Sequence, residues 1–296
     1  MQRLERRPLG MTGLKVSALG LGAGPLGSAE LEDRAVEALL LGALDAGVNL
    51  IDTAPSYGAS EERIGRFLGA RRGDVVLSTK CGYGVPGVED WTPECITRGV
   101  DQALRRLRTD YLDVMHLHSC PEEVLRRTEL VDALRRAVAQ GKVRVAAYSG
   151  DNAALQVALS NGAFSCVQTS VNVFDQRALE VAVPRAAGMG VGVIAKRPLG
   201  NAAWRHDTRP QAHDVGQYWD RMRAMHVDLG GLEWDELALR FAAHAPGVSA
   251  CIVGTTQASR LRRNLDILSR GPLAESQVAG LRGVFRRHDQ GWDGVI

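Results

Sequence analysis

VVLSTK at residues 75–80 and YLDVMHLH at residues 111–118 are two short apolar runs that each end on a titratable side chain. Such runs, rich in Val and Leu and bounded by polar segments, are typical of buried strands. Between them, Thr92 is placed to cap a helix and Pro93 to occupy its first position, and apolar residues then recur at helical spacing. A strand, a helix and a second strand in this order form a parallel unit. This stretch therefore predicts an α/β fold.

The same unit repeats along the chain. Helical patterns separate eight apolar runs, which lie at residues 18–21, 50–52, 75–80, 111–118, 143–149, 166–170, 192–196 and 250–253. Eight strands that alternate with helices fit a closed (β/α)8 barrel, the TIM barrel, better than an open sheet. A barrel of this kind can take up the whole length, so we expect residues 1–296 to form a single domain.

Three further elements fall outside the repeat. Residues 7–11 and 15–17, joined by Thr12 and Gly13, predict a β-hairpin that covers the barrel floor. Residues 200–231 follow the seventh strand and are too numerous for an ordinary connection, so we expect an active-site flap in this long loop. A C-terminal helix completes the predicted fold.

Composition excludes several classes of function. The 36 basic and 34 acidic residues give a net charge of +2, and no long basic block offers the phosphate contacts of a nucleic-acid binder. No apolar run is long enough to span a bilayer, and the charged amino terminus has no apolar segment, so we expect a cytoplasmic protein without a membrane partner. The five cysteines are scattered without metal-ligand spacing, which predicts neither a disulfide framework nor a metal site.

Polar side chains end successive runs of the predicted barrel. Asp52, Lys80 and His118 end the second, third and fourth runs. The later runs add four more polar residues, which are Ser149, Gln168, Lys196 and Arg197. Because a (β/α)8 barrel builds its chemistry at the carboxyl ends of its strands, this set predicts an active site there.

The residues around these strand ends resemble the aldo-keto reductase family. DTA at residues 52–54 is followed by Tyr57 and Gly58, then by Lys80, and then by DYLDVMHLH at residues 110–118. Further matches extend along nearly the whole chain: GKVR at residues 141–144 leading to Ser149, Gln168 with Asn172, PLG at residues 198–200, and Gly254 followed by Arg260 and Asn264. The resemblance implies a TIM barrel that reduces an aldehyde or ketone to an alcohol with NADPH.

The resemblance also assigns four catalytic roles. Tyr57 would give a proton to the developing alkoxide, and Lys80 would help it by placing a positive charge beside the phenol. Asp52 would pair with Lys80 and keep the ammonium charged, while His118 would hydrogen-bond the carbonyl oxygen. His116 lies two residues before His118 and is expected to be a hydrogen-bonding residue of the barrel interior.

The cofactor contacts come from the same resemblance. Ser149 and Gln168 would bind the carboxamide of the nicotinamide, and the helix after the last strand would bind the adenosine phosphates at its amino terminus. Arg260 could bind the 2′-phosphate of the cofactor through two N–H groups. NADPH is therefore the favoured cofactor, and NADH remains possible. The full set of expected cofactor residues is Gly22, Ser149, Gln168, Lys196, Arg197, Pro198, Leu199, Gly254, Thr255, Thr256, Arg260 and Asn264.

GAGPLG at residues 22–27 satisfies the G-x-G-x-x-G pattern of a Rossmann dinucleotide site. Pro25 interrupts the glycines, and the next helix is expected to begin only near Asp33. Asp52, the next acidic residue at a strand end, lies further from the glycines than the acidic residue of a Rossmann site does. We therefore interpret this segment as a loop that borders the nicotinamide end of the site.

Two other functions remain open at this point. In a lyase, Lys80 would form a Schiff base with the carbonyl substrate, although this leaves Tyr57 and Arg260 without a role. In a regulatory barrel, the chain would bind the cofactor with little turnover, although the complete set of catalytic residues argues against this. Each of the three readings implies a small-molecule carbonyl substrate or a nicotinamide cofactor.

Overall fold

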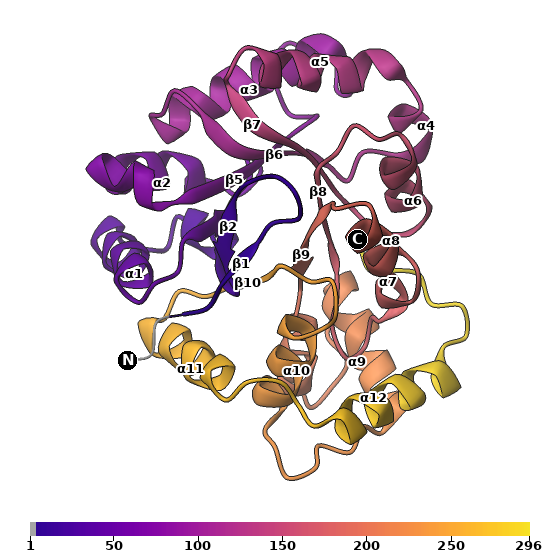
Figure 1. Cartoon of the computed structure of the whole chain (residues 1–296). Helices are drawn as coiled ribbons and strands as arrows, with labels where there is room; N and C mark the ends of the chain where they lie inside the picture. Colours follow the sequence, from indigo (N-terminus) through magenta and orange to yellow (C-terminus); the bar gives the residue numbers. More distant parts are fainter. Residues whose placement is uncertain (1–3) are drawn as a thin grey trace.

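The chain folds as a closed barrel of eight parallel strands surrounded by helices, in a computed structural model that describes residues 4–296 (Figure 1). The strands are β3 (Leu19–Gly22), β4 (Leu50–Asp52), β5 (Val76–Cys81), β6 (Leu112–His118), β7 (Val143–Ser149), β8 (Cys166–Ser170), β9 (Gly192–Lys196) and β10 (Ala250–Gly254). Each pairs with the next in sequence, and β10 closes the barrel on β3. The predicted TIM barrel is confirmed. The first three residues of the charged amino terminus lie outside the described residues.

Amphipathic helices cover the outside of the barrel. They are α1 (Asp33–Asp45), α2 (Ser60–Leu68), α3 (Pro93–Leu107), α5 (Thr128–Ala139), α6 (Asn152–Ser160), α8 (Ala182–Gly188), α10 (Trp234–Ala243) and α11 (Ala258–Ser269). In α3, the Thr92 hydroxyl accepts a hydrogen bond from the Cys95 amide at 3.2 Å, and Pro93 occupies the first turn. This is the predicted cap, and it begins the helix because it satisfies a free N–H group of the first turn. Within residues 4–296, no helix has the length and apolar character that crossing a membrane requires.

The amino-terminal hairpin closes the floor of the barrel, as predicted. Its strands are β1 (Arg6–Pro8) and β2 (Lys15–Ser17), so the predicted first strand, 7–11, was wrong in its bounds. The pairing of β1 with β2 ends before Leu9, because the Leu9 side chain is fully buried in the apolar cluster of the barrel interior, together with Leu14 and Val16. The Met11 amide then donates to the Gly190 carbonyl at 2.7 Å, which holds the turn beneath β9.

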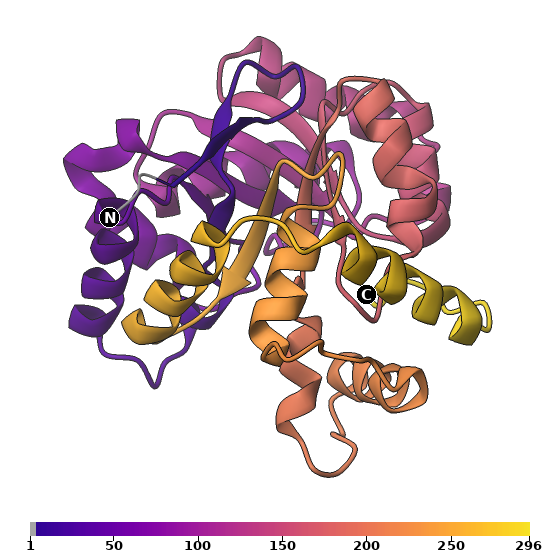
Figure 2. The same cartoon turned by 60° about the horizontal axis from the view of Figure 1, so that its bottom comes forward.

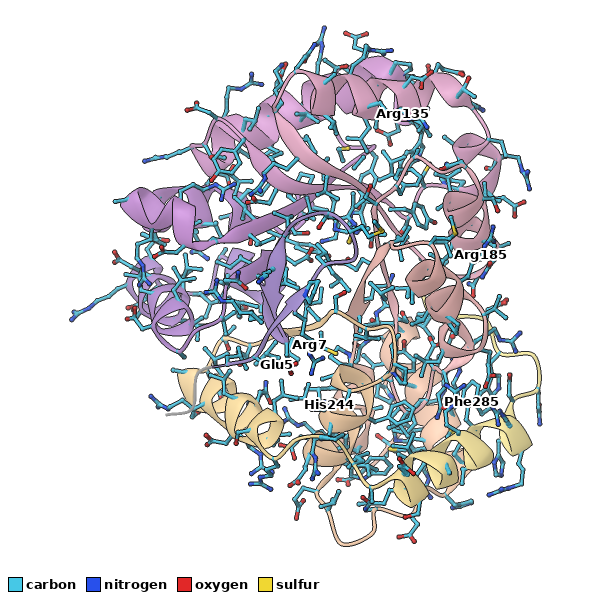
Figure 3. The ribbon with its side chains drawn as sticks, in the orientation of Figure 1. Glu5, Arg7, Arg135, Arg185, His244 and Phe285 are labelled. Carbon is cyan, nitrogen blue, oxygen red and sulfur yellow. The ribbon has the colours of Figure 1, made fainter. Side chains whose placement is uncertain are left out.

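Arg7 fastens the hairpin to α10. Its guanidinium donates to the Ala243 carbonyl and to Glu5, the latter at 2.7 Å, and lies beside His244 (Figure 3). These contacts hold the amino-terminal segment against the end of α10, the helix between β9 and β10.

The segment predicted as a flap has regular structure of its own. It contains a 3-10 helix, η3 (Gly200–Arg205), and α9 (His213–Met225). Tyr218 and Met225 of α9 join Phe285 of the C-terminal helix α12 (Glu275–His288) in a second apolar cluster outside the barrel. Figure 2 shows α9 and α12 together on one side of the barrel. In this segment, α9 packs on α12, and the residues that line the cavity at the carboxyl ends of the strands, Asn201, Ala202 and Arg205, come from η3.

Asp113 of the DYLD motif holds the opposite end of the barrel. Its buried carboxylate accepts hydrogen bonds from Arg72 at 2.8 Å, from Arg144 at 2.8 Å and from the Leu77 amide at 2.9 Å. One side chain therefore links β5, β6 and β7 at their amino-terminal ends. Such contacts support stability, because this end of a (β/α)8 barrel carries no chemistry.

We expect Asp113→Ala to lower the free energy of unfolding by about 2–4 kcal/mol, because it leaves a buried amide and two cations without their acceptor. The measurement is denaturant unfolding followed by circular dichroism. The matched control is Asp110→Ala, which removes an exposed carboxylate of the same motif and should change stability by about 0.5 kcal/mol or less. Equal losses in the two variants would contradict this role for Asp113.

Candidate active site

A cavity of about 890 Å³ opens at the carboxyl ends of the strands, within the size range of small-molecule sites. Three predicted catalytic residues line it: Asp52, Tyr57 and His118. Eleven predicted cofactor residues also line it: Gly22, Ser149, Gln168, Lys196, Arg197, Pro198, Leu199, Gly254, Thr255, Arg260 and Asn264. Two predicted residues do not. Lys80 is buried beneath the surface of the cavity, and Thr256 is exposed outside it.

Lys80 and Asp52 form a buried ion pair under the cavity. The Lys80 ammonium donates to the Asp52 carboxylate at 2.6 Å and to the Thr53 carbonyl at 2.7 Å. Although burial favours loss of charge in Lys80, the Asp52 carboxylate and then Tyr57 raise the pKa of its ammonium. Burial likewise opposes ionisation of Asp52, but Lys80 holds the pKa of this carboxyl below its ordinary value. Both groups are therefore charged at neutral pH.

The second carboxylate oxygen of Asp52 is also satisfied. It accepts from the Ser78 hydroxyl at 2.7 Å and from the Gln168 amide at 2.9 Å. Gln168 in turn accepts from Ser149 at 2.9 Å, which extends the network to the residue expected at the carboxamide. His116 lies 3.0 Å from Ser78 and is fully buried, in the barrel interior. Burial lowers the pKa of His116 to about 4 although the Asp52 carboxylate acts in the opposite direction, so its ring is neutral.

Tyr57 stands over the ion pair. The Lys80 ammonium lies 5.1 Å from the centre of the Tyr57 ring. The backbone around Tyr57 is tied to the loop after β3, because the Ala59 amide donates to the Gly27 carbonyl at 3.1 Å. A Cβ on Gly27 would lie 1.6 Å from the Tyr57 carbonyl oxygen. Gly27, the last glycine of the GAGPLG segment, is thus needed for this close approach and not for a dinucleotide turn.

His118 faces Tyr57 across the cavity. The two rings meet edge to face, with centroids 6.1 Å apart. Burial first, and then the Lys80 charge, lower the pKa of His118 to about 3. The imidazole is therefore neutral at physiological pH and carries one N–H group that can donate a hydrogen bond.

The other end of the cavity suits a phosphorylated ligand. Arg260 and Arg263 line it from α11, with the Arg263 guanidinium held by the Asp235 carboxylate, and no side chain caps the first turn of that helix within the described residues. Free amides at a helix start and nearby guanidinium groups are the usual ligands of phosphate. The sequence analysis missed Arg263, although its spacing of three residues from Arg260 places both on one helix face. The residues present therefore fit a dinucleotide.

Lys196 and Arg197 are engaged by protein groups. The Lys196 ammonium lies 2.8 Å from the buried Asp151 carboxylate, and Arg197 donates to the carbonyl of Val295. Asp151 also accepts from Thr169 at 2.7 Å. Sequence reasoning missed the ion pair, because nothing local connects residues on β9 and on the loop after β7.

Comparisons with known proteins establish the family of the chain. The family model described as "Aldo/keto reductase family" matches residues 18–285. The chain is 31% identical over 292 residues to an L-galactose dehydrogenase of Arabidopsis thaliana, covering 90% of this chain and 88% of that protein. It is 29% identical over 308 residues to a protein of the same plant named "Probable voltage-gated potassium channel subunit beta", covering 91% and 93%.

A solved structure shares the fold. Aldo-keto reductase AKR11C1 from Bacillus halodurans, in its holo form, superposes with a TM-score of 0.83 at 23% identity, covering 95% of this chain and 96% of that one. The family model spans both the strand ends that carry Asp52, Lys80 and His118 and the helix that carries Arg260. The chain belongs to the aldo/keto reductase family and is an NAD(P)H-dependent oxidoreductase acting on carbonyl groups.

Proposed function

We propose that this protein reduces an aldehyde or ketone to the alcohol with NADPH, and that Tyr57 is the proton donor. The observation that carries the proposal is the Lys80–Asp52 pair, buried directly beneath a tyrosine that lines the cavity. A permanently charged ammonium at this place stabilises a phenolate, and it thus helps the phenol to release its proton to a substrate oxygen.

The cofactor would lie along the cavity. When bound, the reduced nicotinamide supplies a hydride to the carbonyl carbon. Ser149 and Gln168 would hold its carboxamide end, and Arg260 and the start of α11 would hold its phosphates. The Arg260 guanidinium on this helix supports a preference for the 2′-phosphate of NADPH over NADH.

The side chains of the site would divide the proton chemistry among them. As the carbonyl oxygen gains negative charge, the neutral ring of His118 donates a hydrogen bond to it. Tyr57 then transfers its hydroxyl proton to this oxygen, which completes the alcohol. The phenolate left on Tyr57 is balanced by Lys80 until a proton from solvent restores it. Asp52 remains ionised throughout and holds Lys80 in place.

The two alternative functions receive less support. A Schiff base needs an accessible neutral amine, whereas Lys80 is 1% exposed, donates two hydrogen bonds and has a raised pKa. A regulatory barrel without turnover has no need of a complete proton-donating set, yet Tyr57, Lys80 and His118 are all present around one cavity. Reductase activity uses every one of these groups.

The first test is Tyr57→Phe. We expect turnover to fall by about 10² or more, with the Kd for NADPH within a few-fold of wild type, because the change removes a proton donor and no cofactor contact. The measurement is steady-state NADPH oxidation over a panel of carbonyl compounds. Tyr111→Phe is the control, since Tyr111 packs against Arg72 at the other end of the barrel. Near-wild-type turnover of Tyr57→Phe would reject the proton-donor role.

The cofactor preference is tested with Arg260→Ala. A charge-assisted hydrogen bond to the 2′-phosphate contributes about 1.5–3 kcal/mol, so affinity for NADPH should fall by roughly 10- to 150-fold while affinity for NADH barely changes. Binding is measured by fluorescence titration of each cofactor. Arg262→Ala, an exposed neighbour on α11, is the matched control. Equal losses of affinity for both cofactors would mean that Arg260 supports the loop between β10 and α11 and does not contact the 2′-phosphate.

Substitutions of Lys80 separate the reductase from the lyase. If Lys80 supplies only charge, turnover should rank wild type first, Lys80→Arg second and Lys80→Met last, because arginine keeps a displaced positive charge. In a Schiff-base mechanism both variants would be equally inactive. Borohydride treatment of wild type with substrate, followed by mass spectrometry, should yield no adduct. A substrate-dependent adduct at Lys80 would overturn the reductase proposal.

A further inference from the structure

A second tyrosine lines the cavity in direct contact with His118. Tyr83 lies in the loop after β5, and its hydroxyl is 2.8 Å from Nδ1 of His118. The two rings are stacked, with centroids 5.4 Å apart and planes inclined by 23°. No role has been given to Tyr83 in the proton chemistry above.

The loop is shaped to hold the Tyr83 ring. The Trp91 amide donates to the Gly82 carbonyl at 2.7 Å, which closes the loop, and the Trp91 ring contacts the Tyr83 ring edge to face at 5.9 Å. Gly82 has a φ of +131°, and a Cβ there would lie 2.1 Å from the Trp91 ring. Tyr83 is thus packed between Trp91 and His118, in a loop conformation that only glycine allows at residue 82.

Tyr83 has no cation of its own. Among the described residues, its hydroxyl meets two uncharged groups, the His118 ring at 2.8 Å and the Ser56 hydroxyl at 3.4 Å. The buried ammonium of Lys80 lies instead over the ring of Tyr57. Tyr83 is therefore not equipped to be a second proton donor to the substrate, and its contact with His118 needs another explanation.

The role proposed for His118 determines which way its hydrogen bond with Tyr83 must run. The Tyr83 hydroxyl can donate to Nδ1 at 2.8 Å, or it can accept from an Nδ1–H group and donate its own proton to Ser56 at 3.4 Å. The neutral His118 ring has one protonated and one unprotonated nitrogen, and only the unprotonated nitrogen can accept. A bond from Tyr83 to Nδ1 therefore places the imidazole proton on Nε2. With the opposite tautomer, Nδ1–H would donate to Tyr83 and Nε2 would have no proton to offer.

We propose that Tyr83 is a positioning residue that fixes His118 as the Nε2–H tautomer, so that Nε2–H is the group that donates to the substrate carbonyl oxygen. This inference rests on the proposed carbonyl reduction and refines it. The nitrogen that binds the carbonyl is selected by a hydrogen bond to the opposite side of the ring, as is common for functional histidines. Tyr83 acts through His118 and does not touch the reacting atoms.

The test reads the tautomer directly. Protein labelled with ¹⁵N at histidine is examined by NMR through the long-range couplings of the imidazole ring, and the His118 signals are assigned from their loss in His118→Gln. In wild type, Nδ1 should have the shift of an unprotonated nitrogen and Nε2 that of a protonated one. In Tyr83→Phe, which keeps the packed ring, both shifts should move toward the average of two exchanging tautomers.

The same variants are compared in turnover. Tyr83→Phe should lower kcat by about 3- to 10-fold, the rate equivalent of one neutral hydrogen bond, without changing the Kd for NADPH. Tyr111→Phe controls for loss of a phenol elsewhere and should leave both the tautomer and kcat unchanged. Ser56→Ala should leave the His118 tautomer unchanged, because in the proposed arrangement the Tyr83 proton lies toward Nδ1 of His118 and not toward Ser56.

Two results would overturn the inference. One is an Nδ1–H tautomer in wild type, and the other is a Tyr83→Phe variant with unaltered His118 shifts and unaltered kcat. If wild type reduces no carbonyl compound, the proposed function fails, while the spectra still decide whether Tyr83 sets the tautomer. If wild type is active and the shifts of His118 do not respond to Tyr83, only the positioning role fails.

Discussion

The ion pair between Lys80 and Asp52 is the contact on which the catalytic end of this barrel depends. Two buried charges are costly unless each is paired and its remaining hydrogen-bonding capacity is used. Here Lys80 also reaches the Thr53 carbonyl, and Asp52 also accepts from Ser78 and Gln168. These partners come from β4, β5, β8 and the loop after β4, so the pair obtains its full set of hydrogen bonds only when β8 lies across the barrel from β4.

The loop that carries Tyr57 is fixed from the same place. Thr53 donates through its hydroxyl to Ser60 at 2.8 Å, and Ser60 donates to the Ala23 carbonyl at 2.8 Å. The loop after β3 is thereby joined to the start of α2, with Gly27 against the Tyr57 backbone. Tyr57 is held over the ammonium by its main chain, as the proposed role of proton donor requires. A preorganised donor of this kind loses little energy in rearrangement when the reaction occurs.

The two ends of the barrel have separate tasks. At the amino-terminal end, the hairpin and the Asp113 carboxylate join strands through contacts that line no catalytic cavity. At the carboxyl-terminal end, polar side chains converge on one cavity, and the C-terminal residues reach its rim. Asn152 exchanges hydrogen bonds with Gly294 at 3.0 and 2.6 Å, and Arg197 donates to Val295. The last residues of the chain are therefore part of the boundary of the cavity.

The sequence alone determined the strands, the capped helix α3 and the placement of Asp52, Lys80 and His118 at strand ends, because hydrophobic periodicity and capping depend on near neighbours in the chain. Tertiary structure decided what each polar side chain contacts. The pairing of Lys196 with Asp151, the stacking of Tyr83 on His118 and the departure of the hairpin at Leu9 all join residues that are distant in sequence. Their geometry depends on closure of the barrel, and no local pattern of residues encodes it.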